Sequence, residues 1–125
     1  MAEPKGTLTG SQLEIMEALW SAGPEGLGAS EIWQALSSRR EVGRTTVLTL
    51  VSRLEKRGWL IPGKGRGARY RPVLGRQEAS QRLAAEFTEA FFDGSASQLV
   101  MSLLGSKRIK PEELRRLRQL LEETS

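Results

Sequence analysis

The sequence predicts a mainly α-helical protein in which three helices, a β-hairpin and three further helices follow one another. Apolar side chains recur three and four residues apart in six segments, which is the spacing that gives a helix one buried face. The stretch from residue 59 to residue 73 differs, because two short apolar runs flank a turn that is rich in glycine. Glycine or proline marks most ends of the helical segments.

The first helix is expected to begin near Thr9, which is placed to form a capping box with Gln12. Gly23-Pro24 is expected to end it. Its apolar face is predicted to comprise Leu13, Met16, Leu19 and Trp20.

The second helix is expected to begin near Gly28. Glu31 then occupies the third helical position, where a carboxylate meets exposed amides and the positive end of the helix dipole. The inward side chains are predicted to be Ile32, Ala35 and Leu36, with Trp33 beside them. Residues 37–43 are polar and are interpreted as a turn.

The third helix is the most informative segment. It is expected to begin between Gly43 and Thr45 and to end at Gly58. Four residues at helical spacing form one apolar stripe that faces inward: Val47, Leu50, Val51 and Leu54. The opposite side carries hydroxyls and cations and almost no carboxylate: Thr45, Thr49, Ser52, Arg53 and Lys56. Such groups bond phosphate oxygens and base edges.

The hairpin is predicted to pair residues 59–61 with residues 71–73 across a basic, glycine-rich turn. Its tip carries Lys64, Arg66 and Arg69. An irregular loop with incidental charge is the alternative, but Trp59, Leu60, Ile61 and Tyr70 are apolar enough to require burial. The three tryptophans of the chain are expected to be packing residues.

The last fifty residues are predicted to form three helices. Leu83, Phe87 and Phe91 lie four residues apart, Ser95 with Gln98 can cap the next helix, and Pro111 can open the last. So short a segment buries little surface alone, so a second copy of the chain is expected to cover it. The predicted dimerisation residues are Phe87, Phe91, Leu99, Leu103, Leu117 and Leu121. Packing of these helices against the first part of the chain is the alternative.

Charge is concentrated in the middle of the chain. Residues 1–38 carry one Lys and five Glu (net −4), residues 39–82 twelve Lys or Arg and three Glu (net +9), and residues 83–125 six Lys or Arg and seven Asp or Glu (net −1). A basic stripe confined to one region is typical of a nucleic-acid footprint. The chain has no His and no Cys, which removes the commonest metal ligands and acid–base catalysts. We expect no cofactor, no metal and no membrane insertion.

Three helices followed by a basic hairpin is the order of a winged helix-turn-helix domain, here residues 7–74, with a helical dimerisation region in residues 75–125. The recognition helix, about residues 44–57, would enter the major groove of operator DNA, and the wing, about residues 59–73, would contact the backbone. A homodimer would bind a pseudo-palindrome. The DNA-binding residues that this arrangement predicts are Thr45, Thr49, Ser52, Arg53, Lys56, Lys64, Arg66 and Arg69.

The segments LTGSQLEIMEALWSAG, SEIWQAL, RTTVLTLVSRLEKRGWL, ARYRPV, FFDGSASQLVMSLL and EELRRLRQLLEE cover nearly the whole chain. They resemble the penicillinase repressor family (BlaI/MecI/CopY type) of bacterial winged helix-turn-helix repressors, which are dimeric. The resemblance implies operator contacts by Thr45, Thr46, Thr49 and Arg53, and backbone contacts by Arg66 and Arg69.

This chain departs from the family pattern at two positions. Arg44 stands where members often have an aromatic residue, and it is expected to bind DNA by adding a phosphate contact or by shifting the base preference. Gly28 stands where members often have Thr. Without cysteine, the chain lacks the metal motif of the copper-responsive members. Residues 102–113 lie in the region comparable to the one in which some members are cleaved through a sensor–protease pathway.

Three other functions are alternatives to a DNA-binding repressor. A winged-helix protein-interaction module needs no cationic face, which disfavours it here. An enzyme would have to use carboxylates such as Glu14, Glu17, Glu86 and Glu89, which fit solvated helix faces better. A ligand-sensing regulator remains open. The absence of Cys and of an N-terminal signal segment favours a cytoplasmic location.

Overall fold

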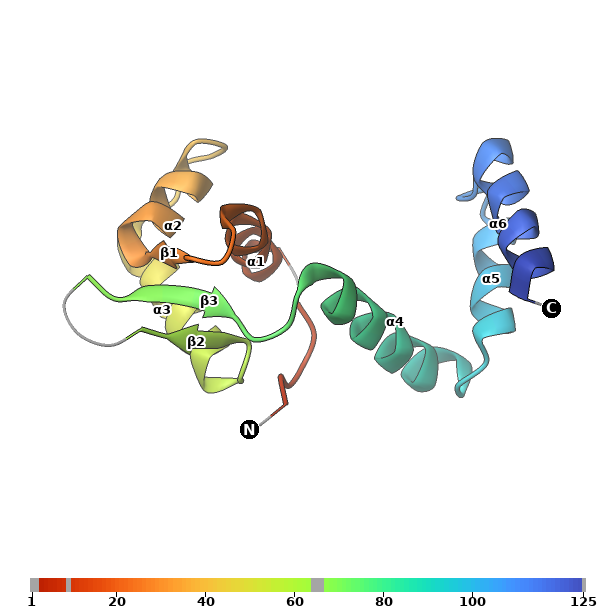
Figure 1. The fold of residues 1–125 in the computed structure, drawn as a ribbon, viewed down its shortest axis with the longest axis horizontal. Helices are drawn as coiled ribbons and strands as arrows, with labels where there is room; N and C mark the ends of the chain where they lie inside the picture. Colours follow the sequence, from red (N-terminus) through yellow and green to blue (C-terminus); the bar gives the residue numbers. More distant parts are fainter. Residues whose placement is uncertain (1–2, 9, 64–66, 125) are drawn as a thin grey trace. The chain divides into compact units, whose positions relative to one another are not determined.

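The computed structural model describes residues 3–8, 10–63 and 67–124, and its elements follow the expected order with one addition (Figure 1). The elements are α1 (Ser11–Ala22), β1 (Leu27–Gly28), α2 (Ala29–Ser37), α3 (Arg44–Lys56), β2 (Leu60–Pro62), β3 (Arg69–Pro72), α4 (Arg76–Phe92), α5 (Ala96–Gly105) and α6 (Pro111–Thr124). The chain divides into two compact units, and the boundary between them along the sequence falls between Gln81 and Arg82, within α4. The mainly helical fold and the hairpin are confirmed.

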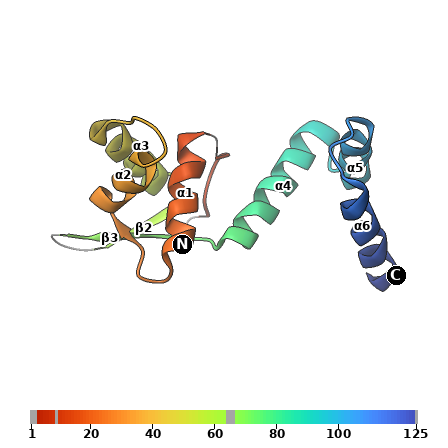
Figure 2. The same cartoon turned by 90° about the horizontal axis from the view of Figure 1, so that it is seen from above.

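The core of the first unit lies between α1, α2 and α3, which Figure 2 shows gathered beside the sheet. Ile15, Met16 and Leu19 of α1 are buried, and so are Ile32 and Leu36 of α2. The prediction for the face of α1 was wrong at Leu13, which is 40% exposed. Ile15, Met16 and Leu19 set the centre of the buried stripe, so Leu13 falls at its edge.

The sheet contains a strand that the sequence did not predict. β1 pairs antiparallel with β3, and β3 pairs antiparallel with β2, giving the order β1-β3-β2. Two residues are too few to show strand alternation, so β1 exists only through its partner. Gly26 precedes it at φ +72°, where a Cβ atom would collide with the carbonyl oxygen of Tyr70.

The hairpin buries its first residues, and its return strand β3 alternates between exposed and half-buried side chains. Trp59 and Leu60 are buried, whereas Ile61 is exposed, so its predicted burial was wrong. Ile61 follows Leu60 in a strand, and successive side chains point to opposite faces. The return strand begins at Arg69, two residues earlier than expected. The tip residues Lys64 and Arg66 lie outside the described residues.

Helix ends agree with the expected signals in part. The Glu31 carboxylate accepts a hydrogen bond from the Gly28 N–H at 3.0 Å, and the Ser95 hydroxyl accepts one from the Gln98 N–H at 3.2 Å. Gly10 is the N-cap of α1 and supplies no side-chain hydrogen bond. The predicted cap, Thr9, lies outside the described residues.

The second unit comprises the rest of α4 together with α5 and α6. None of the described residues of α5 or α6 is buried. None of the helices in the described parts of the chain combines the length and the apolar character that crossing a membrane requires.

Candidate nucleic-acid interface

The outer face of α3 is presented by a firmly packed helix. Val47, Val51 and Leu54 are almost completely buried, and Leu50 is half-buried, so the predicted apolar stripe anchors the helix to the core. Gly43 caps its N-terminus in an extended conformation. The side chains opposite the stripe therefore have a fixed direction, away from the buried core.

All seven predicted contact residues of this helix are exposed: Arg44, Thr45, Thr46, Thr49, Ser52, Arg53 and Lys56. The Thr49 hydroxyl donates to the carbonyl oxygen of Thr45 at 2.9 Å, which fixes its rotamer and leaves its oxygen lone pairs able to accept. Within the described chain, no carboxylate forms an ion pair with Arg53 or Lys56. Hydroxyls and unneutralised cations thus share one surface.

Arg44 is held by an aromatic ring. Its guanidinium carbon lies 4.3 Å from the centre of the Trp33 ring, and the Trp33 indole N–H donates to the carbonyl oxygen of Val42 at 2.9 Å. Trp33 is therefore fixed against the turn between α2 and α3 and acts as a platform for the guanidinium. The N–H groups at the edge of a stacked guanidinium remain available for acceptors.

The wing cation Arg69 is bound within its own domain. Its Nε donates to the carbonyl oxygen of Glu25 at 3.1 Å, its Nη2 to that of Gly26 at 2.8 Å, and its Nη1 lies 2.9 Å from the Glu31 carboxylate. The sequence predicted a DNA contact at this residue. The structure instead places most of its donors on the segment that leads into α2.

Arg71 is a wing cation that the sequence analysis overlooked. It lies two residues after Arg69 on the same face of β3, opposite Ile61 of β2, and it is exposed. No ion pair involves it in the described part of the chain. A strand that begins at Arg69 places Arg71 on the same exposed face, because alternate side chains of a strand point to the same side. The expected strand began at residue 71, so this signal was missed.

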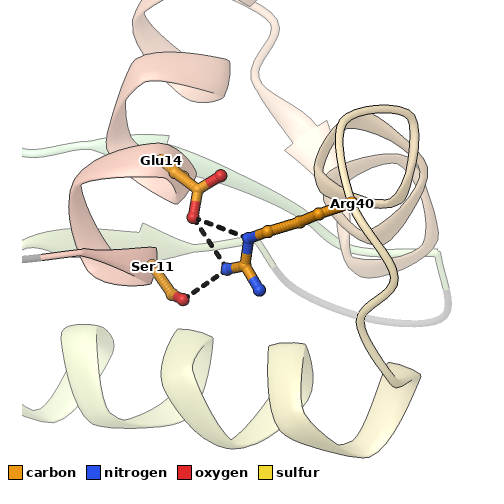
Figure 3. A network of polar contacts seen from close by, with 3 residues as sticks. All are labelled: Ser11, Glu14 and Arg40. Carbon is orange, nitrogen blue, oxygen red and sulfur yellow. Dashed lines mark hydrogen bonds and ion pairs between the residues drawn. The ribbon is translucent and has the colours of Figure 1, made fainter.

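Several central cations are neutralised by glutamates of the acidic N-terminal segment. Arg40 lies 2.7 Å from the Glu14 carboxylate and also donates to the Ser11 hydroxyl, as Figure 3 shows. Arg76 makes a bidentate contact with Glu17, at 2.6 and 3.1 Å. Together with the pair that Arg69 forms with Glu31, these contacts mean that the net charge of residues 39–82 overstates the charge offered to a partner.

The Arg40 pair also changes proton affinities. The hydrogen bond from Arg40 holds the pKa of the Glu14 carboxyl below its ordinary value, and the same bond raises the pKa of Arg40. Both shifts follow from a charged pair that joins Glu14 of α1 to Arg40 in the turn between α2 and α3.

An apolar surface of a different kind lies on the second unit. Phe91 is 75% exposed, and its ring stacks on that of Phe87 with centroids 5.0 Å apart. Leu103, Leu117 and Leu121 are also exposed, and Leu99 is half-buried.

Among the described residues, no group of three or more acidic side chains is arranged to hold a metal ion.

Comparison with known proteins gives the family. The profile described as "Penicillinase repressor" matches residues 8–123. This chain belongs to the penicillinase repressor family. It is similar to the "Penicillinase repressor" of Bacillus licheniformis, with 26% identity over 117 residues that cover 93% of this chain and 90% of the relative.

It is also similar to the "Transcriptional regulator BlaI" of Mycobacterium tuberculosis (strain ATCC 25618 / H37Rv), with 32% identity over 111 residues that cover 87% of this chain and 78% of the relative. The "Penicillinase repressor" of Staphylococcus aureus is 22% identical over 126 residues, 100% of this chain and 98% of the relative. The chain is accordingly a transcriptional repressor of this bacterial family, and the matched region includes both units.

Proposed function

We propose that this repressor binds a specific, pseudo-palindromic operator as a homodimer, in the cytoplasm. In this proposal residues 7–74 form the DNA-binding domain and residues 75–125 the dimerisation region. α3 enters the major groove, and the β2–β3 hairpin lies on the phosphate backbone.

One observation carries the proposal. α3 displays hydroxyls and cations on a face that is fixed by a buried stripe, and no carboxylate neutralises Arg53 or Lys56 among the described residues. A face of this kind is unfavourable in a protein–protein core, where charged groups would have to be desolvated. It is suited to a polyanion whose base edges offer hydrogen-bond partners.

Residue roles follow from reach and chemistry. Thr45, Thr46, Thr49 and Arg53 are proposed to contact base edges, because they are exposed on α3 and the resemblance to the repressor family implies operator contacts at these positions. Arg44, Ser52 and Lys56, with Lys64 and Arg66 of the wing, are proposed to contact phosphates. Arg69 is proposed to act mainly by holding the wing, since three of its nitrogens are engaged within the domain.

Dimerisation is proposed through the second unit. Its exposed side chains include two phenylalanines and several leucines, and none of the described residues of α5 or α6 is buried, which is the condition of apolar helices that a further chain has to cover. A second copy of the same surface would cover it, and the two α3 helices would then face successive half-sites. The proposed contact residues are Phe87, Phe91, Leu99, Leu103, Leu117 and Leu121.

The test is selection of bound sequences from random duplex DNA, followed by titration of the recovered sequence and a scrambled duplex at several salt concentrations. We expect an inverted repeat and a preference for the operator of at least a thousandfold. Equal binding to both duplexes, or none in dilute salt, would contradict the proposal and favour a protein-interaction module.

Release by proteolysis belongs to the same proposal. Residues 102–113 include the connection between α5 and α6, and all of them except Ile109 are exposed. A sensor–protease pathway would cleave in this region and separate the two subunits. An immunoblot in which the chain stays intact through induction would contradict cleavage, without affecting operator binding.

A further inference from the structure

Leu48 is an apolar residue on the otherwise polar, exposed side of α3. It is 50% exposed on a helix whose other exposed residues are polar or charged. Thr45 lies three residues before it and Ser52 four residues after it, so the three side chains lie along one line of the helix surface. The leucine is therefore presented together with residues that are proposed to contact DNA.

The surroundings of Leu48 limit what can cover it. Leu48, Trp33, Arg44, Ala29 and Ser30 line an open, mainly apolar depression of about 220 Å³ between α2 and α3. The stacked Arg44 places a cation at this depression. An apolar side chain bordered by a guanidinium and hydroxyls is unsuited to a lipid or to a purely apolar protein surface, and is suited to the wall of a DNA groove.

The chemistry of the major groove then identifies one DNA group that Leu48 can contact favourably. The C5-methyl group of thymine is the apolar group that the major-groove edges of the four bases present. Opposite any other base edge, Leu48 would remove water from a polar atom and offer no hydrogen bond in return, which is unfavourable. A leucine in this place therefore favours thymine and disfavours the other bases.

We propose that Leu48 is a specificity-determining residue that packs against the methyl group of one thymine in each half-site. This inference rests on the proposed function, because it requires α3 to lie in the major groove. It adds an apolar, methyl-reading contact to the hydrogen-bonding contacts of the threonines and Arg53.

The experiment removes the methyl group alone. Each thymine of the selected operator is replaced in turn by deoxyuridine, which keeps every hydrogen-bonding atom of the base. Affinity is measured for the unaltered chain and for the Leu48→Ala variant. Leu13→Ala is the matched control, because Leu13 is similarly exposed but lies on α1. Melting temperature and binding to scrambled DNA establish that both variants are folded.

We expect one thymine per half-site at which deoxyuridine weakens binding about fourfold, and about fifteenfold when both half-sites are changed, which is the value of burying one methyl group in each. Leu48→Ala should bind the thymine and deoxyuridine operators equally, and Leu13→Ala should retain the difference.

Two results would overturn this inference alone. The first is that deoxyuridine lowers the affinity at none of the operator thymines. The second is that the loss of affinity on deoxyuridine replacement persists in Leu48→Ala, which would mean that a threonine methyl group, and not Leu48, contacts the thymine methyl group. Failure to bind any operator would instead overturn the proposed function, and this inference with it.

Discussion

Replacement of Arg69 by alanine distinguishes two roles for a wing cation. In one role the guanidinium neutralises a DNA phosphate. In the other it joins the start of β3 to the segment that leads into α2, through the carbonyl oxygens of Glu25 and Gly26 and the carboxylate of Glu31. The two roles predict different losses, so a single variant separates them.

The contacts set the magnitude. A hydrogen bond from a charged group to a shielded acceptor contributes about 1.5–3 kcal/mol. The Arg69 and Glu31 side chains are each 45% exposed, so water screens their ion pair, which then contributes roughly 0.2–1 kcal/mol. Because these contacts are exposed or only partly buried, water replaces part of what is lost, and we expect Arg69→Ala to lower the free energy of unfolding by about 1–2 kcal/mol, the lower end of these contributions.

Arg71→Ala is the matched control, because Arg71 lies on the same face of the same strand and has no ion pair among the described residues. It should leave the unfolding midpoint unchanged. Denaturant unfolding of both variants is compared with their affinity for operator DNA as a function of salt. Loss of one phosphate contact per subunit should reduce the salt slope of a dimer by about 1.8.

The expected result is a less stable Arg69→Ala protein whose salt slope is the same as that of the unaltered chain. An unchanged unfolding midpoint combined with a slope reduced by about 1.8 would show that Arg69 is a phosphate ligand. The reasoning from its intramolecular contacts would then be refuted.

Three further predictions use other assays. Thr46→Ala or Arg53→Ala should lower the ratio of operator to scrambled-DNA affinity by about 5- to 150-fold, the equivalent of 1–3 kcal/mol, whereas Lys56→Ala should weaken both duplexes equally. Phe91→Glu should raise the dimer dissociation constant at least about tenfold in sedimentation, with an unchanged helical circular dichroism signal. Because the folded pKa of Glu14 is lowered from 4.5, its ion pair stabilises the protein above that pH and is lost as the pH falls through the folded pKa. Glu14→Gln should thus lower the melting temperature at pH 7, and the difference should shrink as the pH falls below 4.5 and vanish once the Glu14 carboxyl is protonated in the folded protein; a difference that stays constant through this acid range would contradict the ion-pair explanation.

The parts of the fold that the sequence predicted are those set by local periodicity. In α3, the spacing of Val47, Val51 and Leu54 determines both the buried stripe and the direction of the opposite face, so the helix and its exposed residues could be assigned together. Pro111 and the glutamates after it set the start of α6 in the same local way.

The parts that were missed depend on contacts between distant residues. β1 is two residues long and is defined by its pairing with β3, more than forty positions later. The burial of Ile15 in place of Leu13 depends on which side of α1 meets α2 and α3. No local pattern contains that information, because both leucine and isoleucine fit an apolar helix face.

The same limit applies to charge, with a consequence for function. The net charge of residues 39–82 includes Arg40, Arg69 and Arg76, but each of these arginines is paired with a glutamate of α1 or α2. Glutamates of α1 and α2 thus neutralise three cations that lie outside α3, whereas Arg53 and Lys56 of α3 and Arg71 of β3 have no ion pair among the described residues. A narrower positive surface fixes the register of a duplex better than a diffuse one, because displacement along or around the DNA loses more of the attraction. The salt dependence of operator binding should consequently reside in the cations of α3 and the wing, and substitutions at Arg40 or Arg76 should leave it unchanged.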